Sequence, residues 1–283
     1  MKASEINVRD PFVLVNDGKY YLYGTRAKNT WDDVPPYPQG FDVYVSTDLE
    51  EWSKPKSIFE NSDDFWGTRN FWAPEVHKYN GKFYMLASFT ADGYHRGTAI
   101  FECDTPDGVF KEHSNGAITP KDWECLDGTL YVENGTPYIV FCHEWTQIKN
   151  GSVCALELTP DLKNSVGEPI ELWAAGSAPW ADDIRGNGTY VTDGPFLVKK
   201  QSEELICIWS SYSKGEYVEA ISRSDNGSIK GNWSIDNKLL FEKNGGHGMI
   251  FTDLDGNGKF TYHIPNDTPN ERPAFATLNI ENL

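Results

Sequence analysis

The stretch that decides the fold is Asp10-Pro11-Phe12-Val13-Leu14, followed by Asn16-Asp17-Gly18 and Tyr20-Tyr21-Leu22-Tyr23. Two short apolar runs enclose a turn here, and glycine tolerates the positive φ that a tight hairpin needs. An opening of this kind recurs roughly every 50 to 70 residues, which is typical of the blades of a β-propeller. The four later copies begin Ala73-Pro74-Glu75-Val76-His77, Asp127-Gly128-Thr129-Leu130-Tyr131, Asp193-Gly194-Pro195-Phe196-Leu197 and His247-Gly248-Met249-Ile250-Phe251.

Each copy continues in the same way. A third apolar run follows, such as Asp42-Val43-Tyr44-Val45-Ser46, and a polar turn with an outer edge strand usually comes after it. We therefore predict an all-β fold, a five-bladed β-propeller with four antiparallel strands per blade. No linker separates the copies, so we expect residues 1–283 to form a single domain. A β-sandwich of short strands is the alternative, but it does not explain why one opening recurs five times.

Composition narrows the classes of function. The 283 residues carry a formal net charge of −17 at a sequence pI near 4.7, and aromatic residues make up 14%. An acidic surface repels phosphate backbones, so we expect no nucleic-acid partner. No run of 18 apolar residues is present, so we expect no membrane-spanning helix. Abundant aromatic residues suit β structure and contact with carbohydrate.

The N-terminus and the cysteines bear on location. Met1-Lys2-Ala3-Ser4-Glu5 lacks the apolar core of a signal peptide, so we expect a cytoplasmic protein. A signal removed from the native gene product would instead allow a periplasmic or secreted location. The five cysteines are an odd number without paired short spacing, which favours buried thiols in a reducing compartment. The oligomeric state stays open.

The repeated openings predict one pocket. Inner strands of a propeller begin around its axis, so Asp10, Asp127 and Asp193 should converge there. Two carboxylates are the minimum for hydrolysing a glycosidic bond, because one protonates the leaving oxygen and the other activates water. A third carboxylate nearby raises the pKa of the group that acts as the acid, because like charges repel. A metal site is the competing explanation for such a cluster. Second strands end at the same face, and their ends carry Arg26, His143, Glu144 and Trp145.

At these residues the chain resembles glycoside hydrolase family 43, inverting enzymes on a five-bladed propeller that act on arabinose-, xylose- and sometimes galactose-containing glycans. Arg9-Asp10-Pro11 resembles the opening motif of the family, whose Asp is the general base. Trp72-Ala73-Pro74-Glu75-Val76 resembles its second-blade motif. The resemblance implies that Asp127 orients the acid and tunes its pKa.

Two later residues also match the family. His247 resembles an axial histidine that in some relatives lies by an ion or a water molecule. The resemblance implies no required cofactor, and it leaves open a structural Ca²⁺ on the propeller axis, near His247 and bound through water. Arg272 lies where a late-blade arginine often reaches the pocket.

The fourth blade departs from the family pattern. The family usually has Glu-Gly-Pro there, with Glu as the general acid, whereas this chain has Asp193-Gly194-Pro195. Aspartate is one methylene shorter, and misplacement on that scale can cost about a hundredfold in rate. Glu144 is the natural substitute as acid, so Asp193 and Glu144 stand as two candidates, with weak catalysis as a third reading.

The resemblance implies an inverting exo-glycosidase that removes terminal α-L-arabinofuranosyl residues from plant-type oligosaccharides. β-xylosides and β-galactosides are the runners-up. The alternatives are a carbohydrate-binding propeller with weak or lost catalysis and a structural propeller organised by a cation. Residues 28–40 and 176–189 are candidate rim loops, and Trp31, Phe71 and Trp180 are further candidates for stacking on sugars. The predicted substrate-binding residues are Arg26, Trp72, His143, Trp145, His247 and Arg272.

Overall fold

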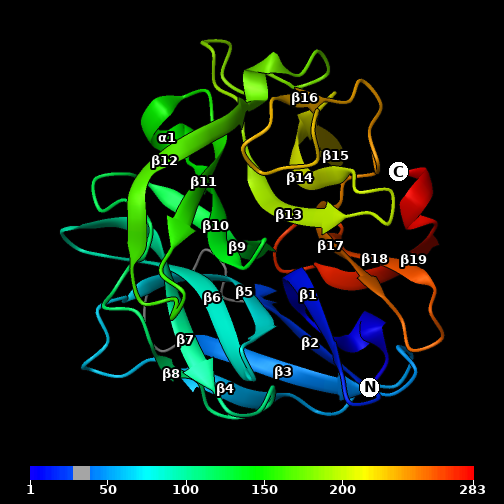
Figure 1. Cartoon of the computed structure of the whole chain (residues 1–283). Coiled ribbons are helices and arrows are strands. Elements are labelled where there is room, and N and C mark those ends of the chain that lie inside the picture. The colour runs from blue at the N-terminus through cyan, green and yellow to red at the C-terminus, as the bar shows by residue number, and fades with distance from the viewer. Residues whose placement is uncertain (28–38) are drawn as a thin grey trace.

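The computed structural model describes residues 1–27 and 39–283, and in them five antiparallel sheets form a ring (Figure 1). The first blade contains β1 (Val8–Asn16), β2 (Lys19–Arg26), β3 (Gly40–Ser46) and β4 (Lys56–Glu60). The second contains β5 (Arg69–Tyr79), β6 (Lys82–Ala91), β7 (Tyr94–Cys103) and β8 (Lys111–Glu112). The third contains β9 (Cys125–Glu133), β10 (Thr136–His143), β11 (Ser152–Leu158) and β12 (Ser165–Ala174).

The last two blades complete the ring. The fourth contains β13 (Asp193–Lys199), β14 (Leu205–Ser213), β15 (Glu216–Ser224) and β16 (Trp233–Ile235). The fifth contains β17 (Gly246–Thr252), β18 (Gly258–Ile264) and β19 (Arg272–Leu278). The described helical segments are η1 (Ala3–Glu5), α1 (Trp145–Ile148), η3 (Ala175–Ser177) and η4 (Ile280–Asn282). The five-bladed propeller predicted from the sequence is confirmed, and the fifth blade departs from it with three strands in the described residues.

The inner strands β1, β5, β9, β13 and β17 surround the axis. Each contacts the next along the chain, and β1 also contacts β17, which closes the ring. The ring is fastened between the first and fifth blades, where Trp52 stacks on Phe275 with ring centroids 5.8 Å apart. The Arg272 Nε donates to the Ser4 carbonyl at 3.1 Å on the same seam. The two ends of the chain lie on this side of the molecule (Figure 1).

Apolar cores lie between neighbouring blades. Phenylalanine rings fill the space between the first and second blades, as in the tilted pair of Phe41 and Phe71 with centroids 6.2 Å apart. Burying such a side chain contributes about 1.5–3 kcal/mol. Phe71 therefore belongs to the core and is not placed for stacking on a sugar. Trp180 packs 5.4 Å from Trp209, and its indole N–H donates to the Asp236 carbonyl.

Every inner strand opens with a bulge at which one residue has a positive φ. The strand register shifts at each of these points, and the local twist re-aims the side chains there. Gly194 lies at the fourth bulge, where an added Cβ would come within 2.6 Å of the His247 ring. The bulge residues and their φ angles are Asp10 (54°), Ala73 (46°), Asp127 (56°), Gly194 (52°) and His247 (48°).

This pattern corrects the repeat alignment. The repeated openings place Asp193 level with Asp10 and Asp127, but Gly194 takes the bulge position, so Asp193 lies one residue earlier. The reason is steric, because a Cβ at position 194 would lie within 2.6 Å of the His247 ring, so this bulge has room only for glycine. The prolines carried the signal: aligning Pro11 with Pro195 places Gly194 opposite Asp10.

The bulges also bind the blades to one another. Each bulge N–H donates to a side chain of the preceding blade, so the ring is closed by five hydrogen bonds. Four acceptors occupy one position of the second strand, opposite the residue before the bulge; in the third blade that position is Cys142, and the Asp127 carboxylate accepts from Gly194 instead. The other donor–acceptor pairs are Ala73–Thr25, Asp127–Ser88, His247–Ser210 and Asp10–His263.

Two further observations concern the described residues. None of the five cysteines forms a disulfide. No helix among residues 1–27 and 39–283 has the length and apolar character needed to cross a membrane.

Candidate active site

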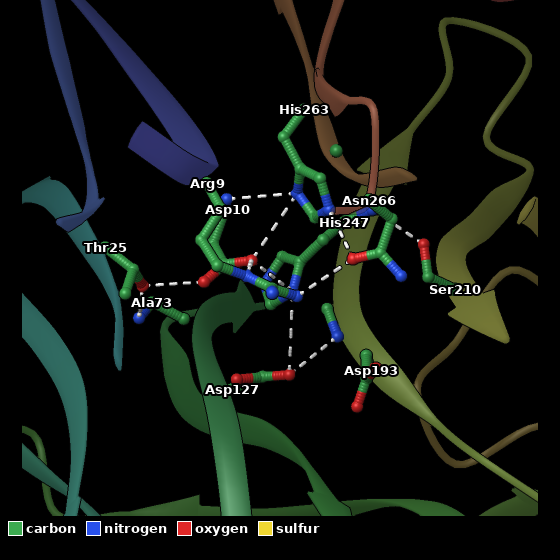
Figure 2. Close-up of polar contacts among 12 residues, drawn as sticks. Arg9, Asp10, Thr25, Ala73, Asp127, Asp193, Ser210, His247, His263 and Asn266 are labelled. Carbon is green, nitrogen blue, oxygen red and sulfur yellow. Dashed lines mark hydrogen bonds and ion pairs between the residues drawn. The ribbon is translucent and has the colours of Figure 1, made fainter. Parts of the chain in front are cut away.

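A cavity of about 610 Å³ opens where the inner strands begin. All five blades contribute a bulge or pre-bulge residue to it, so the convergence expected from the repeat is present (Figure 2). Of the predicted site residues, its described lining contains Asp10, Trp72, Asp127, Glu144, Trp145, Asp193 and His247.

Asp10 lies buried in a cage of donors (Figure 2). Its Oδ2 accepts from the Thr25 hydroxyl at 2.6 Å, while its Oδ1 lies 3.2 Å from the Arg9 Nε and 3.1 Å from the His247 Nδ1. Burial alone would raise the pKa of Asp10, but His247 and Arg9 outweigh it and hold this pKa well below its ordinary value. Asp10 is therefore an ionised carboxylate at neutral pH.

His263 contacts the backbone of Asp10 as a neutral ring. Its Nδ1 accepts the Asp10 backbone N–H at 3.2 Å, and its Nε2 lies 3.2 Å from the Asn266 Oδ1. Burial lowers the pKa of His263 to about 3, in agreement with an Nδ1 that accepts. His263 thus positions the bulge and adds no charge beside the carboxylate.

Asp127 and Asp193 lie in a different electrostatic setting. The Asp127 Oδ2 accepts from the Gly194 N–H at 3.0 Å, and the Asp193 Oδ2 accepts from the Tyr217 hydroxyl at 3.0 Å. Burial, and then the charge of Asp10, raises the pKa of Asp127 well above its ordinary value. Burial, and then Asp127, raises the pKa of Asp193 to about 7. Together these two carboxyl groups retain a proton near neutral pH, since interacting acids titrate as a pair.

Glu144 lines the cavity, and its carboxylate forms an ion pair with Arg96. The guanidinium donates its Nη1 to the Glu144 Oε2 and its Nη2 to the Asn70 Oδ1, and it lies 4.5 Å from the centre of the Trp72 ring. A proton on Glu144 would weaken this charge-assisted contact. Arg96 and Glu144 together form a wall that holds Trp72 at the cavity.

Three predicted binding residues are not among the described lining. Arg26 is paired with Asp42 at 2.8 Å and with Glu60 at 2.9 Å. His143 stacks on Trp123 with centroids 4.0 Å apart, and Arg272 lies on the seam between blades described above. Each is at a strand end near the correct face, but strand position does not fix where a long side chain points. Trp31 and most of the 28–40 loop lie outside the described residues.

The sequence reasoning missed several residues of the lining. Tyr217 lies on β15, the third strand of its blade, whereas the repeat predicts site residues only on first and second strands. Asn266, Asp267 and Thr268 come from the β18–β19 connection, which carried no repeat signal. Ile184 confirms that the 176–189 loop reaches the rim. The described lining residues not predicted as site residues are Arg9, Leu126, Ile184, Val191, Tyr212, Tyr217, Asn266, Asp267 and Thr268.

The expectation of an axial calcium ion stays a prediction. Calcium takes six to eight oxygen ligands, and the described residues contain no group of three or more His, Cys, Asp or Glu arranged to hold a metal. The His247 Nδ1 is directed at Asp10, and it lies 3.8 Å from the Asp127 Oδ2. The side chains of the described residues do not form a calcium cage.

Comparison with known proteins decides the family. The model of the family described as "Glycosyl hydrolases family 43" matches residues 4–279. The chain belongs to this family. The resemblance noted from the sequence motifs to a glycoside hydrolase family is confirmed.

Individual relatives add detail. A solved structure titled endo-arabinase, from Bacteroides thetaiotaomicron VPI-5482, is 37% identical, covers 99% of this chain and 97% of its own, and has a TM-score of 0.90. Extracellular endo-alpha-(1->5)-L-arabinanase 1 of Bacillus subtilis (strain 168) is 24% identical over 52% of this chain and 46% of its own. Alpha-L-arabinofuranosidase 43 of Humicola insolens is 23% identical over 87% of this chain and 52% of its own. The matches thus span about half the length of these two curated relatives.

Proposed function

We propose that this enzyme hydrolyses α-L-arabinofuranosyl linkages of plant-type oligosaccharides with inversion at the anomeric carbon. The observation that carries the proposal is the split between two cavity carboxyl groups. The pKa of Asp10 lies well below its ordinary value, whereas that of Asp193 is raised to about 7. Environments that separate the pKa values of two carboxyl groups in this way create a base and an acid in one site.

The division of labour follows from these states. Asp10, as a carboxylate, takes a proton from water whose oxygen attacks the anomeric carbon. Asp193, as a carboxylic acid, gives its proton to the glycosidic oxygen as the carbon–oxygen bond breaks. Asp127 holds the Gly194 amide and contributes to the raised pKa of Asp193. Between Asp193 and Glu144, the ion pair of Glu144 with Arg96 favours Asp193 as the acid.

The sugar is proposed from the relatives. The names quoted above describe arabinanases and an arabinofuranosidase, which supports an arabinosyl substrate over the β-xylosides and β-galactosides that we also considered. Release of terminal residues, predicted from the sequence, and a cytoplasmic location both stay predictions.

The test compares Asp193→Asn with Glu144→Gln on two substrates, an aryl α-L-arabinofuranoside with an acidic leaving group and α-1,5-arabinotriose. A leaving group of low pKa needs little protonation, so loss of the acid should harm triose cleavage far more. We expect Asp193→Asn to lose about 10²–10⁴-fold in kcat/KM on the triose and much less on the aryl substrate. Glu144→Gln should affect both substrates alike.

Two results would contradict the proposal. If Glu144→Gln alone shows the leaving-group dependence, Glu144 is the acid. If the wild type binds these sugars but cleaves neither them nor their xylosyl and galactosyl counterparts, the chain is a carbohydrate-binding propeller without catalysis. The anomer of the first product, observed by NMR, tests inversion directly.

A further inference from the structure

Cys142 interrupts a pattern that the other four blades share. It occupies the position on β10 opposite Leu126, the residue before the Asp127 bulge. In the other blades this position carries a hydroxyl or an imidazole, which accepts the bulge N–H of the next blade. Oxygen and imidazole nitrogen are good acceptors, whereas the sulfur of a neutral thiol accepts hydrogen bonds weakly. The residues at this position in the other blades are Thr25, Ser88, Ser210 and His263.

The Cys142 thiol lies in the core beside two of the catalytic carboxyl groups. The residue is 0% exposed. Burial, and then the charges of Asp127 and Asp193, raise the pKa of the thiol well above its ordinary value. The sulfur is therefore a protonated thiol at neutral pH, without the negative charge that would make it a strong acceptor. Position 142 thus lies near both carboxyl groups and offers the next bulge amide only a weak partner.

The first blade shows what a hydroxyl at this position does. The Thr25 Oγ1 accepts the Ala73 N–H at 2.7 Å and donates to the Asp10 Oδ2 at 2.6 Å (Figure 2). The hydroxyl therefore stands between the amide of the second blade and the aspartate of its own blade. The Asp10 carboxylate is joined to the neighbouring bulge through this hydroxyl.

The third blade has the same turn without the hydroxyl. Asp127 takes the bulge at a φ of 56°, against 54° for Asp10, so the two side chains leave the backbone from equivalent positions. Here the Gly194 N–H donates directly to the Asp127 Oδ2 at 3.0 Å. Gly194 follows Asp193, so the direct bond ties the Asp127 carboxyl group to the strand that carries the acid. After burial, the charge of Asp127 is the largest cause of the raised pKa of Asp193.

We propose that Cys142 is a positioning residue for the acid: its thiol leaves the Gly194 N–H to Asp127, which is thereby held beside Asp193. The inference rests on the proposed function, in which Asp193 is the acid and Asp127 tunes it. A hydroxyl at position 142 would accept the Gly194 N–H and donate to Asp127, as Thr25 does for Asp10. The Asp127 carboxyl group would then lie one hydroxyl further from the fourth blade.

The first measurement is a double-mutant cycle on melting temperature, which does not depend on activity. Asp127→Ala removes the acceptor, and alanine fits the bulge because Ala73 occupies the equivalent position at a φ of 46°. We expect Cys142→Ser to raise the melting temperature of Asp127→Ala by about 1–4 °C, because the new hydroxyl accepts the Gly194 N–H. In the wild-type background the same change should give no gain. The matched control is Cys154→Ser, since Cys154 is 1% exposed on β11 of the same blade, and it should act alike in both backgrounds.

The second measurement is the pH profile of kcat/KM on α-1,5-arabinotriose, which a merely structural role would not move. In Cys142→Ser we expect the basic limb to move to lower pH by about half a unit to one unit, because the charge of Asp127 lies further from Asp193. Cys154→Ser should leave the limb in place.

Two results would overturn the inference while the proposed function stands. One is an additive cycle, in which Cys142→Ser changes the melting temperature equally with and without Asp127. The other is a basic limb of Cys142→Ser that stays in place or moves to higher pH while the triose is still cleaved. If the wild type cleaves no arabinosyl, xylosyl or galactosyl substrate, the proposed function fails, and the acid role that Cys142 serves fails with it.

Discussion

The openings of the first and fourth blades share one backbone and differ in where they place a carboxylate. Both pass through a bulge followed by proline, but Asp10 occupies the bulge in the first blade, whereas Asp193 precedes Gly194 in the fourth. The bulge directs Asp10 into Thr25, Arg9 and His247. One residue earlier, Asp193 has the Tyr217 hydroxyl and the nearby charge of Asp127.

This difference teaches that one repeated turn can hold two carboxyl groups whose pKa values shift in opposite directions. Cations and donors lower the pKa of Asp10, while burial and a neighbouring carboxylate raise the pKa of Asp193. The raised pKa of Asp193 also bears on the fourth blade, where the family usually has a glutamate and this chain has Asp193. A raised pKa lets the shorter aspartate still act as the proton donor, and the predictions below test each side of this comparison.

The largest effect is expected from removing the base. Asp10→Asn keeps the shape of the side chain and tolerates the positive φ of the bulge, but it cannot take a proton from water. We expect kcat/KM to fall by about 10²–10⁴-fold on the aryl and the natural substrates alike. The equal loss distinguishes a base from an acid, whose loss depends on the leaving group.

The matched control for this variant is Asp17→Asn. Asp17 is exposed at the turn of the same hairpin and also has a positive φ, of 48°. It should retain wild-type activity and melting temperature. Full activity of Asp10→Asn on every arabinosyl, xylosyl and galactosyl substrate would refute the role assigned to Asp10.

The sequence was sufficient for the ring of blades because the hairpin signal is local and repeated. Apolar runs around Asn-Gly and Asp-Gly turns specify strand pairs directly, and five copies leave few other folds. The three-stranded fifth blade could not be foreseen, since short outer strands pair through few residues and leave little pattern. The ring of inter-blade hydrogen bonds, such as Ser210 to the His247 N–H, likewise depends on contacts between distant segments.

For the site, sequence position predicted which backbone segments converge but not where long side chains point. Asp10, Asp127 and His247 are fixed by the bulge itself, so their convergence followed from the repeat. Arg26 pairs with Asp42, and that pairing depends on a neighbouring strand. Tyr217 was missed because it reaches the cavity from the third strand of its blade.

A smaller effect is expected from Asp193→Asn on the free energy of unfolding, and its sign follows from the raised pKa of Asp193. The unfolded chain ionises Asp193 near its ordinary pKa of 3.8, whereas the folded protein holds the proton up to about 7. Wild type therefore loses unfolding free energy as pH rises through this window, and Asp193→Asn avoids the loss. We expect the variant to be more stable at pH 7 by up to about 4 kcal/mol, at 1.36 kcal/mol per pKa unit.

Urea denaturation at pH 3.5 and pH 7 measures this difference. The gain from Asp193→Asn should nearly vanish at the lower pH, where the carboxyl group is mostly protonated in both states. Asp10→Asn should behave in the opposite way and destabilise the protein at pH 7, because the low pKa of Asp10 favours folding above its unfolded value. Destabilisation by Asp193→Asn at pH 7 would show that Asp193 is ionised in the folded state.

The smallest effect is expected from Tyr217→Phe, and it is read from a pH profile. The Tyr217 hydroxyl donates to the Asp193 Oδ2, which favours the ionised form and lowers the pKa of Asp193. Asp193 acts while protonated, so kcat/KM of the wild type should fall as pH rises through about 7. Without the hydroxyl the pKa rises further, so the basic limb should move to higher pH. Tyr212→Phe, which removes a hydroxyl bonded to Asn266, should leave that limb in place; an unmoved limb in Tyr217→Phe would mean that another group sets it.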